Sequence, residues 1–355
     1  MAAITQFFLG ANSGAGFQSL FSQMAQTPDT YDLMILKGGP GAGKTAFLRQ
    51  LGQTMEEAGE RVEYFQCSGD PDALDGLALP DMACAVLDGA PPHPLEPRYP
   101  AAVDRIVDLG RFCDLTAAKA ARDQIVALTQ RREAAQSQAV RCLRAARQVE
   151  RETVEAGKAG FDVRRANRRL DGVIAREIRK KGGEAGRTDD RFLGGITCDG
   201  AIWRFDSAET LCPRIYELSD RWELAGPLLA RLGCAATGRG WNVIACPSPE
   251  DAGRLEHLLI PGLGLGFLTS RPGMEYGKKP FRRIRLDALT CAEERGRERF
   301  LRRMTASLRA EAVSALQEAR SAERELAAVY APYVDEDGVR ATAAIEAGRL
   351  LSWRR

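Results

Sequence analysis

The stretch LMILKGGPGAGKTAFLRQL, residues 33–51, decides the fold. Its first four residues are a short apolar run, typical of a buried strand. The segment GGPGAGKT follows from Gly38 and fits the pattern G-x-x-x-x-G-K-[ST]. Beyond it, one helical stripe carries Phe47, Leu48, Leu51 and Met55. The order strand, glycine loop, helix is the context in which this pattern binds phosphate.

The residue types of this loop suit a polyphosphate. Glycine adopts the positive φ that turns backbone N–H groups inward, where a side chain would cost about 1–2 kcal/mol. The following helix directs its positive dipole end to the same point. Lys44 places a cation near the β- and γ-phosphates, and the Thr45 hydroxyl suits Mg²⁺. The predicted ATP-binding positions are Gly38, Gly39, Pro40, Gly41, Ala42, Gly43, Lys44, Thr45 and Ala46.

An acidic residue follows a later apolar strand. Residues 62–67 are expected to form a second strand and residues 83–89 a third, with Asp88 near its end. An acid in this place holds Mg²⁺ through water in many P-loop proteins. We therefore predict that Thr45 and Asp88 bind Mg²⁺, and that Lys44 and Asp88 serve catalysis.

The catalytic base is not evident. Gly89 stands where many ATPases carry a glutamate, so the base comes from elsewhere or the attacking group is not water. Asp70, Asp72 and Asp75, in the acidic segment 67–76, are candidates. The alternative for this segment is a solvated turn with a helix cap.

Two other segments near this region have ordinary explanations. His93, in APPHP, is expected to be a surface loop residue rather than a phosphate contact. Residues 8–17 hold three glycines and are expected to form a turn rather than a cap over the base.

Size and composition describe an ordinary globular chain. It has 355 residues, enough for about two domains, with 28% charged and 45% apolar residues and a net charge of +2. Nine scattered cysteines lack metal-binding spacing, and the chain has only two histidines, so a reducing, cytoplasmic location without a histidine metal site is expected. We find no signal peptide and no segment able to span a bilayer, so no membrane association is expected.

The chain repeats itself. FFLGANSGAGF at 7–17 resembles RFLGGITCDGA at 191–201, and Phe21 matches Phe205 at the same offset of 184. Farther along the offset becomes 181, as in Leu51 and Leu232. Self-similarity over half the chain predicts a tandem duplication of one α/β unit.

Both halves then continue into long helical patterns. Apolar residues at 125–149 form a coiled-coil-like seam, a glycine-containing turn at 156–160 follows, and a second helix covers 163–178. The second half has a helical stripe at 301–329 and a final helix that reaches Trp353. We therefore predict two doubly wound parallel-sheet units, each with an antiparallel helical hairpin. The predicted divisions are an NTPase core at 1–115, a helical arm at 116–182, a degenerate repeat at 190–290 and a C-terminal arm at 291–355.

The second half lacks the phosphate chemistry. At offset 181 the loop becomes SDRWELAG, residues 219–226, without lysine, and Asp88 becomes Thr269. Asp220 and Glu223 would repel phosphate. We predict a pseudo-NTPase repeat that does not bind nucleotide in this way. It could instead cover the first site and offer an arginine to it, such as Arg221 or Arg271.

The helical arm is locally basic but poor in aromatic residues that would stack on bases. Its cations are Arg164, Arg165, Arg168, Arg169, Arg176, Arg179, Lys180 and Lys181. Nucleic-acid binding is therefore not the expected function, and a solvated helix face is.

These motifs resemble those of P-loop NTPases and, more narrowly, of a family of bacterial tandem-repeat P-loop ATPase-like proteins. The resemblance rests on the segments 7–17, 35–45, 67–76, 86–110 and 260–270. It implies the fold and nucleotide binding but no substrate. Members of that family often keep a P-loop in the second half, and this chain does not.

Three functions follow as hypotheses. The first is a Mg-dependent ATPase that couples nucleotide binding to its helical arms or to a protein partner. The alternatives are a small-molecule kinase that uses the acidic segment 67–76, and a non-catalytic, nucleotide-dependent scaffold.

Overall fold

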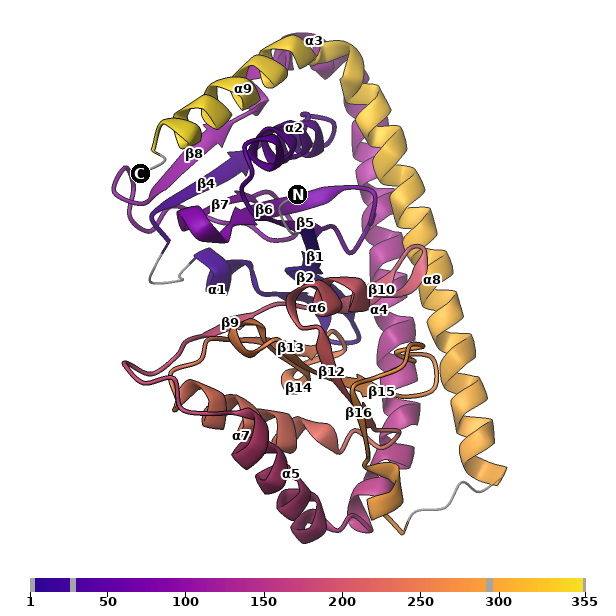
Figure 1. The fold of residues 1–355 in the computed structure, drawn as a ribbon. Coiled ribbons are helices and arrows are strands. Elements are labelled where there is room, and N and C mark those ends of the chain that lie inside the picture. Colours follow the sequence, from indigo (N-terminus) through magenta and orange to yellow (C-terminus); the bar gives the residue numbers. More distant parts are fainter. Residues whose placement is uncertain (1–3, 26–29, 292–295, 354–355) are drawn as a thin grey trace.

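The computed structural model describes residues 4–25, 30–291 and 296–353. Two six-stranded sheets lie one above the other, and two long helices run along one side of both (Figure 1). None of the described helices combines the length and apolarity needed to cross a membrane.

The first sheet is organised around β4 (Asp32–Lys37), in which five successive residues are buried. The glycine loop leads from this strand into α2 (Lys44–Glu57). The sheet has the order β1-β5-β6-β7-β4-β8. Its other strands are β1 (Ile4–Phe8), β5 (Val62–Gln66), β6 (Leu74–Leu79), β7 (Cys84–Asp88) and β8 (Asp104–Asp108). A hairpin of β2 (Gly10–Ser13) and β3 (Gly16–Ser19) and the short α1 (Phe21–Ala25) follow β1.

The second sheet repeats this topology. Its order is β9-β13-β14-β15-β12-β16, which places equivalent strands in equivalent positions. Its strands are β9 (Thr188–Asp190), β12 (Arg214–Ser219), β13 (Val243–Ser248), β14 (Asp251–Ile260), β15 (Leu265–Ser270) and β16 (Arg282–Arg285). The accompanying elements are the hairpin β10 (Gly194–Thr197)–β11 (Gly200–Trp203), α6 (Phe205–Leu211) and α7 (Ala225–Thr237). The two halves are thus repeats of one α/β arrangement, which we call the first and second repeat.

The sheets are mixed rather than wholly parallel, which corrects our expectation. In the first repeat β6 runs antiparallel to both β5 and β7, and the other pairs are parallel. In the second repeat β14 takes the same place. The physical reason is the short connection at residues 67–73, because a parallel crossover needs a dozen or more residues.

Three apolar layers hold the molecule together. The inner layer lies between the sheets and joins Ile35 and Phe65 of the first repeat to Ile215 and Leu259 of the second. The outer layers cover the opposite sheet faces: α2 lies on the first sheet and α7 on the second. The repeats therefore share one core between them.

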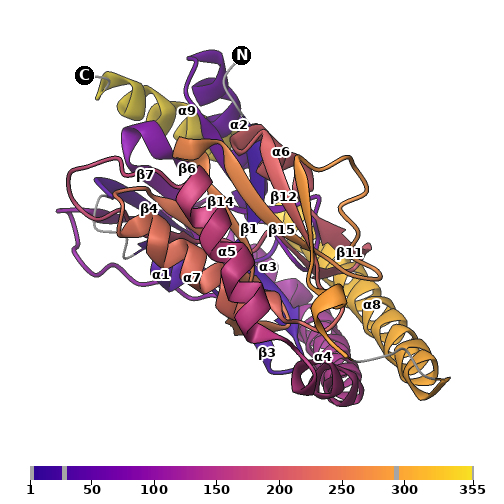
Figure 2. The same cartoon turned by 60° about the horizontal axis from the view of Figure 1, so that its bottom comes forward.

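The long helices pair with each other. They are α4 (Arg122–Ala159) and α8 (Gly296–Tyr330), and Figure 2 shows them side by side from a second direction. Arg131 forms an ion pair with Glu318, and Gln138 bonds to Glu311, so the helices are antiparallel. Their buried positions are mostly alanine, leucine and small residues, which permit close packing.

This pairing contradicts the predicted hairpin within each half. The short helix α3 (Leu115–Ala118) precedes α4, and α5 (Val163–Glu177) packs on α7 of the second repeat. Conversely, α9 (Glu336–Ser352) packs on α2 of the first repeat. Each repeat therefore covers its outer face with a helix from the other repeat. Apolar stripes were predicted for α4, α5 and α8, and α9 was predicted only as a final helix. A stripe does not specify its partner.

Candidate functional site

The glycine loop has the backbone geometry that its sequence predicts. Gly41 has φ +73° and Gly43 has φ +79°, so two positions occupy the left-handed region that favours glycine. Lys44 is the first residue of α2, so the N-terminal end of this helix adjoins the loop. An anion seated in this loop would meet backbone N–H groups and the positive end of the helix.

The side chains of Lys44 and Asp88 meet at this loop. Strand β7 lies parallel to and beside β4, with Asp88 opposite Leu36. Asp88 consequently ends its strand next to the loop, and the Lys44 Nζ lies 2.8 Å from its Oδ2. Both side chains are largely buried, with 16% and 11% of their surface exposed. The Thr45 Oγ1 is nearby in sequence and accepts a hydrogen bond from Leu74 N at 3.3 Å.

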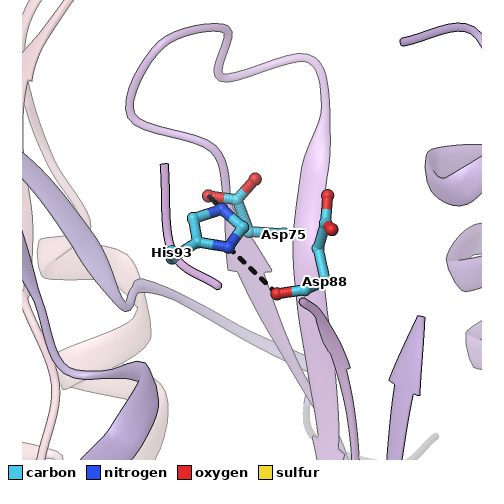
Figure 3. A group of neighbouring side chains, drawn as sticks. All are labelled: Asp75, Asp88 and His93. Carbon is cyan, nitrogen blue, oxygen red and sulfur yellow. Dashed lines mark hydrogen bonds and ion pairs between the residues drawn. The ribbon is translucent and has the colours of Figure 1, made fainter. Parts of the chain in front are cut away.

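A buried histidine completes a cluster with two carboxylates (Figure 3). His93 Nδ1 donates to the Asp88 carbonyl at 2.9 Å, because a carbonyl oxygen can only accept. His93 Nε2 lies 3.7 Å from Asp75 Oδ2, and the imidazole stacks on Phe21 with ring centroids 3.9 Å apart. The three side chains of the cluster offer ligand atoms within 4.8 Å of one another.

Burial and charge act in opposite directions on His93. Burial lowers the pKa of the imidazole, but the neighbouring carboxylate of Asp75, with the charge of Asp88, outweighs burial and raises the pKa. His93 is buried, so our expectation of a surface loop residue was wrong. The carboxylates of Asp75 and Asp88 and the Thr45 hydroxyl are hard oxygen donors that fit Mg²⁺.

The three aspartates of the acidic segment do not act together. Asp75 lies in strand β6 and points to His93, whereas Asp70 pairs with Arg324 and, at 3.9 Å, with Arg320 of α8. Asp72 also pairs with Arg324. Only Asp75 of the three therefore belongs to the buried cluster.

The second repeat covers the glycine loop with its helices. A Cβ on Gly41 would lie 3.0 Å from the Ala327 carbonyl oxygen of α8, and one on Gly43 would lie 3.0 Å from Val339 Cγ1 of α9. The arginines that α8 brings to this side are Arg320 and Arg324. Their helical sequence context offered no signal for this placement.

The two arginines that we suggested for this role belong elsewhere. Arg271 pairs with Glu223 at 3.3 Å and with Glu256 at 3.1 Å, inside the second repeat. The backbone N–H of Arg221 donates to Asp287, also in that repeat. That part of the prediction was wrong.

In the second repeat a carboxylate of the protein accepts from the backbone amides at the start of the equivalent helix. Asp220 accepts hydrogen bonds from Leu224 N at 2.6 Å and Ala225 N at 2.9 Å, at the start of α7. Burial raises the pKa of Asp220 to about 6 against these hydrogen bonds. Trp222 stands at the position equivalent to Gly41, and its side chain packs against Gly157 of α4.

The neighbouring carboxylate is held by arginines. Glu223 pairs with Arg147 at 2.7 Å, Arg254 at 3.2 Å and Arg271 at 3.3 Å. Burial raises the pKa of Glu223, but the three guanidinium groups outweigh it and lower the pKa to about 2. The negative charge of Glu223 in this loop is therefore neutralised by arginines of the protein itself.

The hairpin after β1, which we expected to be a turn, connects the two repeats beside the site. Asn12 of β2 donates from Nδ2 to the carbonyls of Ser68 and Ile196, at 3.0 Å each. It thereby ties the loop before β6 to the second repeat. The glycines at 8–17 concealed this strand pair, because they favour turns.

Comparisons of the chain with protein-family models, with curated proteins and with solved structures found no match. The functional argument therefore rests on the chemistry of the site itself.

Proposed function

We propose that the first repeat binds ATP with Mg²⁺ and acts as an ATPase that couples nucleotide binding to the helices of the second repeat. The observation that carries the proposal is the pairing of Lys44 with Asp88 beside a glycine loop at the start of a helix. A lysine and an aspartate with these neighbours serve polyphosphate and metal in P-loop NTPases.

Each side chain has a role that its position supports. Backbone N–H groups within residues 38–46, of which Pro40 has none, and the Lys44 ammonium would bind the phosphates. Thr45 and Asp88 would hold Mg²⁺. The metal, when bound, would neutralise phosphate charge. Asp75 and His93 lie beside Asp88, so this pair is the best-placed acceptor of a proton from the attacking group.

Contacts of α8 and α9 with the loop support the coupling. Ala327 and Val339 lie against Gly41 and Gly43, so a ligand that moves the loop also moves these helices. Closely packed neighbours transmit such displacements. A protein partner of the long helices would sense the nucleotide in this way.

Nucleotide binding is tested with Lys44→Ala. At ATP one hundred times above Kd, Mg-ATP should stabilise the unmodified protein by about 2.7 kcal/mol, and the variant by much less. Chemical denaturation with and without Mg-ATP measures the difference. Lys119→Ala, at an exposed lysine, is the control and should respond like the unmodified protein. Equal stabilisation of the Lys44→Ala protein would reject the proposal.

A small-molecule kinase is the second candidate, and one observation favours it. Asp75 and His93 form a buried pair beside Asp88, while the position after Asp88 is Gly89 rather than glutamate. Asp75 would orient an acceptor hydroxyl. ADP release that rises above the rate with water alone when a metabolite mixture is added would favour the kinase. Binding without ADP release in either condition would instead indicate a nucleotide-dependent scaffold.

A further inference from the structure

A cavity of about 440 Å³ lies between the second repeat and the long helix α4. The hairpin β10–β11, the loop after β15 and the facing parts of α4 and α8 line it. Trp222, at the position equivalent to Gly41, is one wall. The volume lies within the range of small-molecule sites, which is about 300–1,000 Å³.

The wall is mainly apolar. Its apolar side chains include Val154, Ile196, Trp203, Trp222, Pro249 and Met274. The half-buried indole of Trp203 offers a flat, polarisable surface, which favours an aromatic ligand, whereas Trp222 is only 2% exposed and closes the wall. A ligand that buries such surface gains from the hydrophobic effect without needing a charge.

Several of the charges around the cavity are already paired. Arg309 lies 2.7 Å from Glu250 and 3.0 Å from Glu150, and Arg271 pairs with Glu223 and Glu256. The backbone amides at the start of α7 are occupied by the carboxylate of Asp220. A phosphate would find neither free amides there nor unneutralised guanidinium groups on Arg271 and Arg309.

Two polar atoms of the lining are buried without a hydrogen-bond partner among the described residues. They are the Trp203 Nε1, which is a donor, and the Glu298 Oε2, which is an acceptor. Buried polar groups are normally paired, so such atoms beside a cavity indicate a missing partner. A ligand carbonyl would accept from the indole N–H of Trp203.

We propose that this cavity binds an uncharged aromatic small molecule that carries a carbonyl group. The cavity adjoins the segment equivalent to the glycine loop, but its chemistry is different. Trp222 stands in place of a glycine, and the carboxylate of Asp220 accepts from the backbone amides at the start of α7. It does not depend on nucleotide binding by the first repeat.

The test uses prodan, a neutral naphthalene with one ketone, whose emission reports polarity and hydrogen bonding. Titration into the full chain should give one bound prodan per chain with blue-shifted emission. Ala306→Phe, which fills the cavity from α8, should weaken binding at least tenfold. Ala310→Phe, one turn away on the same helix and outside the lining, is the matched control and should bind as the unmodified protein does.

Trp203→Phe keeps an aromatic ring but removes the N–H. It should weaken binding about threefold to tenfold and shift the emission of bound prodan further to the blue. Thermal unfolding of each variant checks that the fold is retained. Failure of prodan to bind, unchanged affinity in both Ala306→Phe and Trp203→Phe, or displacement of prodan by ATP with loss of binding in Lys44→Ala would each overturn the proposal.

Discussion

At the scale of single residues, the backbone of Gly43 combines two constraints. Its φ is +79°, and an added Cβ would approach Val339 Cγ1 to 3.0 Å. Gly172, in the exposed part of α5, has neither constraint, because no atom lies within 4 Å of its Cβ direction. The two glycines should therefore respond to alanine in opposite directions.

We expect Gly43→Ala to lower the free energy of unfolding by about 1–2 kcal/mol, because the left-handed conformation is costly for alanine. Gly172→Ala should raise it by about 0.5–1 kcal/mol, since alanine favours a helix interior. Urea unfolding measures both. Stabilisation by Gly43→Ala would show that the loop does not hold this conformation in solution.

His257 is a buried base whose protonation opposes folding. Its Nδ1 accepts from Thr269 N at 3.1 Å, and Glu256 Oε2 lies 3.8 Å from its Nε2. Burial and the charges of Arg271 and Arg254 lower the pKa to about 4, although Glu256 acts in the opposite direction. The folded protein therefore binds this proton less readily than the unfolded chain, whose pKa is near 6.5.

Protonation of His257 therefore lowers the free energy of unfolding as the pH falls. His257 contributes stability that is fully present above about pH 6.5 and is lost as the pH falls toward 4, by at most about 1.4 kcal/mol per pH unit. His257→Asn should remove this part of the acid sensitivity. Urea unfolding of both proteins between pH 7 and 4 measures it, and parallel stability curves would contradict the assignment.

The residues of the candidate site differ in how well their positions could be predicted from the sequence. Lys44 and Asp88 were placed correctly near the loop because each follows an apolar strand in a local pattern. The burial of His93 was missed, since it depends on Phe21 and Asp75, which are brought to it by the tertiary fold. A lone histidine in a proline-rich segment carries no such information.

At the scale of elements, the helices form one continuous alanine-rich seam. Ala139 of α4 and Ala312 and Ala315 of α8 belong to one apolar cluster. Small side chains let the helices approach closely, so the seam has little room for larger residues. The same sequence pattern would suit several partners, which explains why the predicted hairpins were wrong while the helices themselves were right.

We expect Ala322→Leu, at a fully buried position of α8, to destabilise the protein by about 1–3 kcal/mol through overpacking. Ala328→Leu, at an exposed position of the same helix, should change stability by less than about 0.5 kcal/mol. Thermal or urea unfolding gives the comparison. Equal effects of the two changes would mean that α4 and α8 are not packed along this seam.

Strand β6 could not be predicted from its residue types. Its sequence LDGLAL contains aspartate and glycine, which are uncommon in strands, and its first three residues belong to the segment 67–76 that was interpreted as an acidic loop. Gly76 is required there because a Cβ would come within 2.7 Å of the Val86 carbonyl oxygen. The close approach of two strands, rather than a turn, explains this glycine.

At the scale of the whole molecule, each repeat depends on the other for its outer layer. Leu48 and Leu51 of α2 belong to the same apolar cluster as Ala343 and Leu350 of α9. Removal of the second half would expose that face of the first repeat. The repeats are therefore similar in topology but are not independent folding units.

A fragment of residues 1–182 should accordingly expose apolar surface, aggregate or unfold without cooperativity, because it lacks α9 and the partner of α4. Coexpression with residues 183–355 should restore a soluble complex. Size-exclusion chromatography and circular dichroism distinguish these states. A monomeric 1–182 fragment with a cooperative thermal transition would contradict the interdependence of the repeats.

The duplication was visible in the sequence, but its spatial symmetry was not. Phe8 and Phe192 occupy equivalent positions in the two repeats, and each donates its N–H to the carbonyl of the other at 2.9 Å. A reciprocal contact between equivalent residues is the signature of a two-fold interface. Sequence offsets identify equivalent residues along the chain, but they do not give the rotation that relates the two repeats in space.

That reciprocal pair suggests how the molecule arose. Two identical half-length polypeptides could make the same contact, exchange their terminal helices and present two alike sites. After fusion of the two genes, the halves could accumulate different substitutions. The first half would keep its lysine in the glycine loop, and in the second half tryptophan and acidic residues would replace the glycines. Descent from one ancestral half would then explain both the symmetric backbone and the different residues of the two loops.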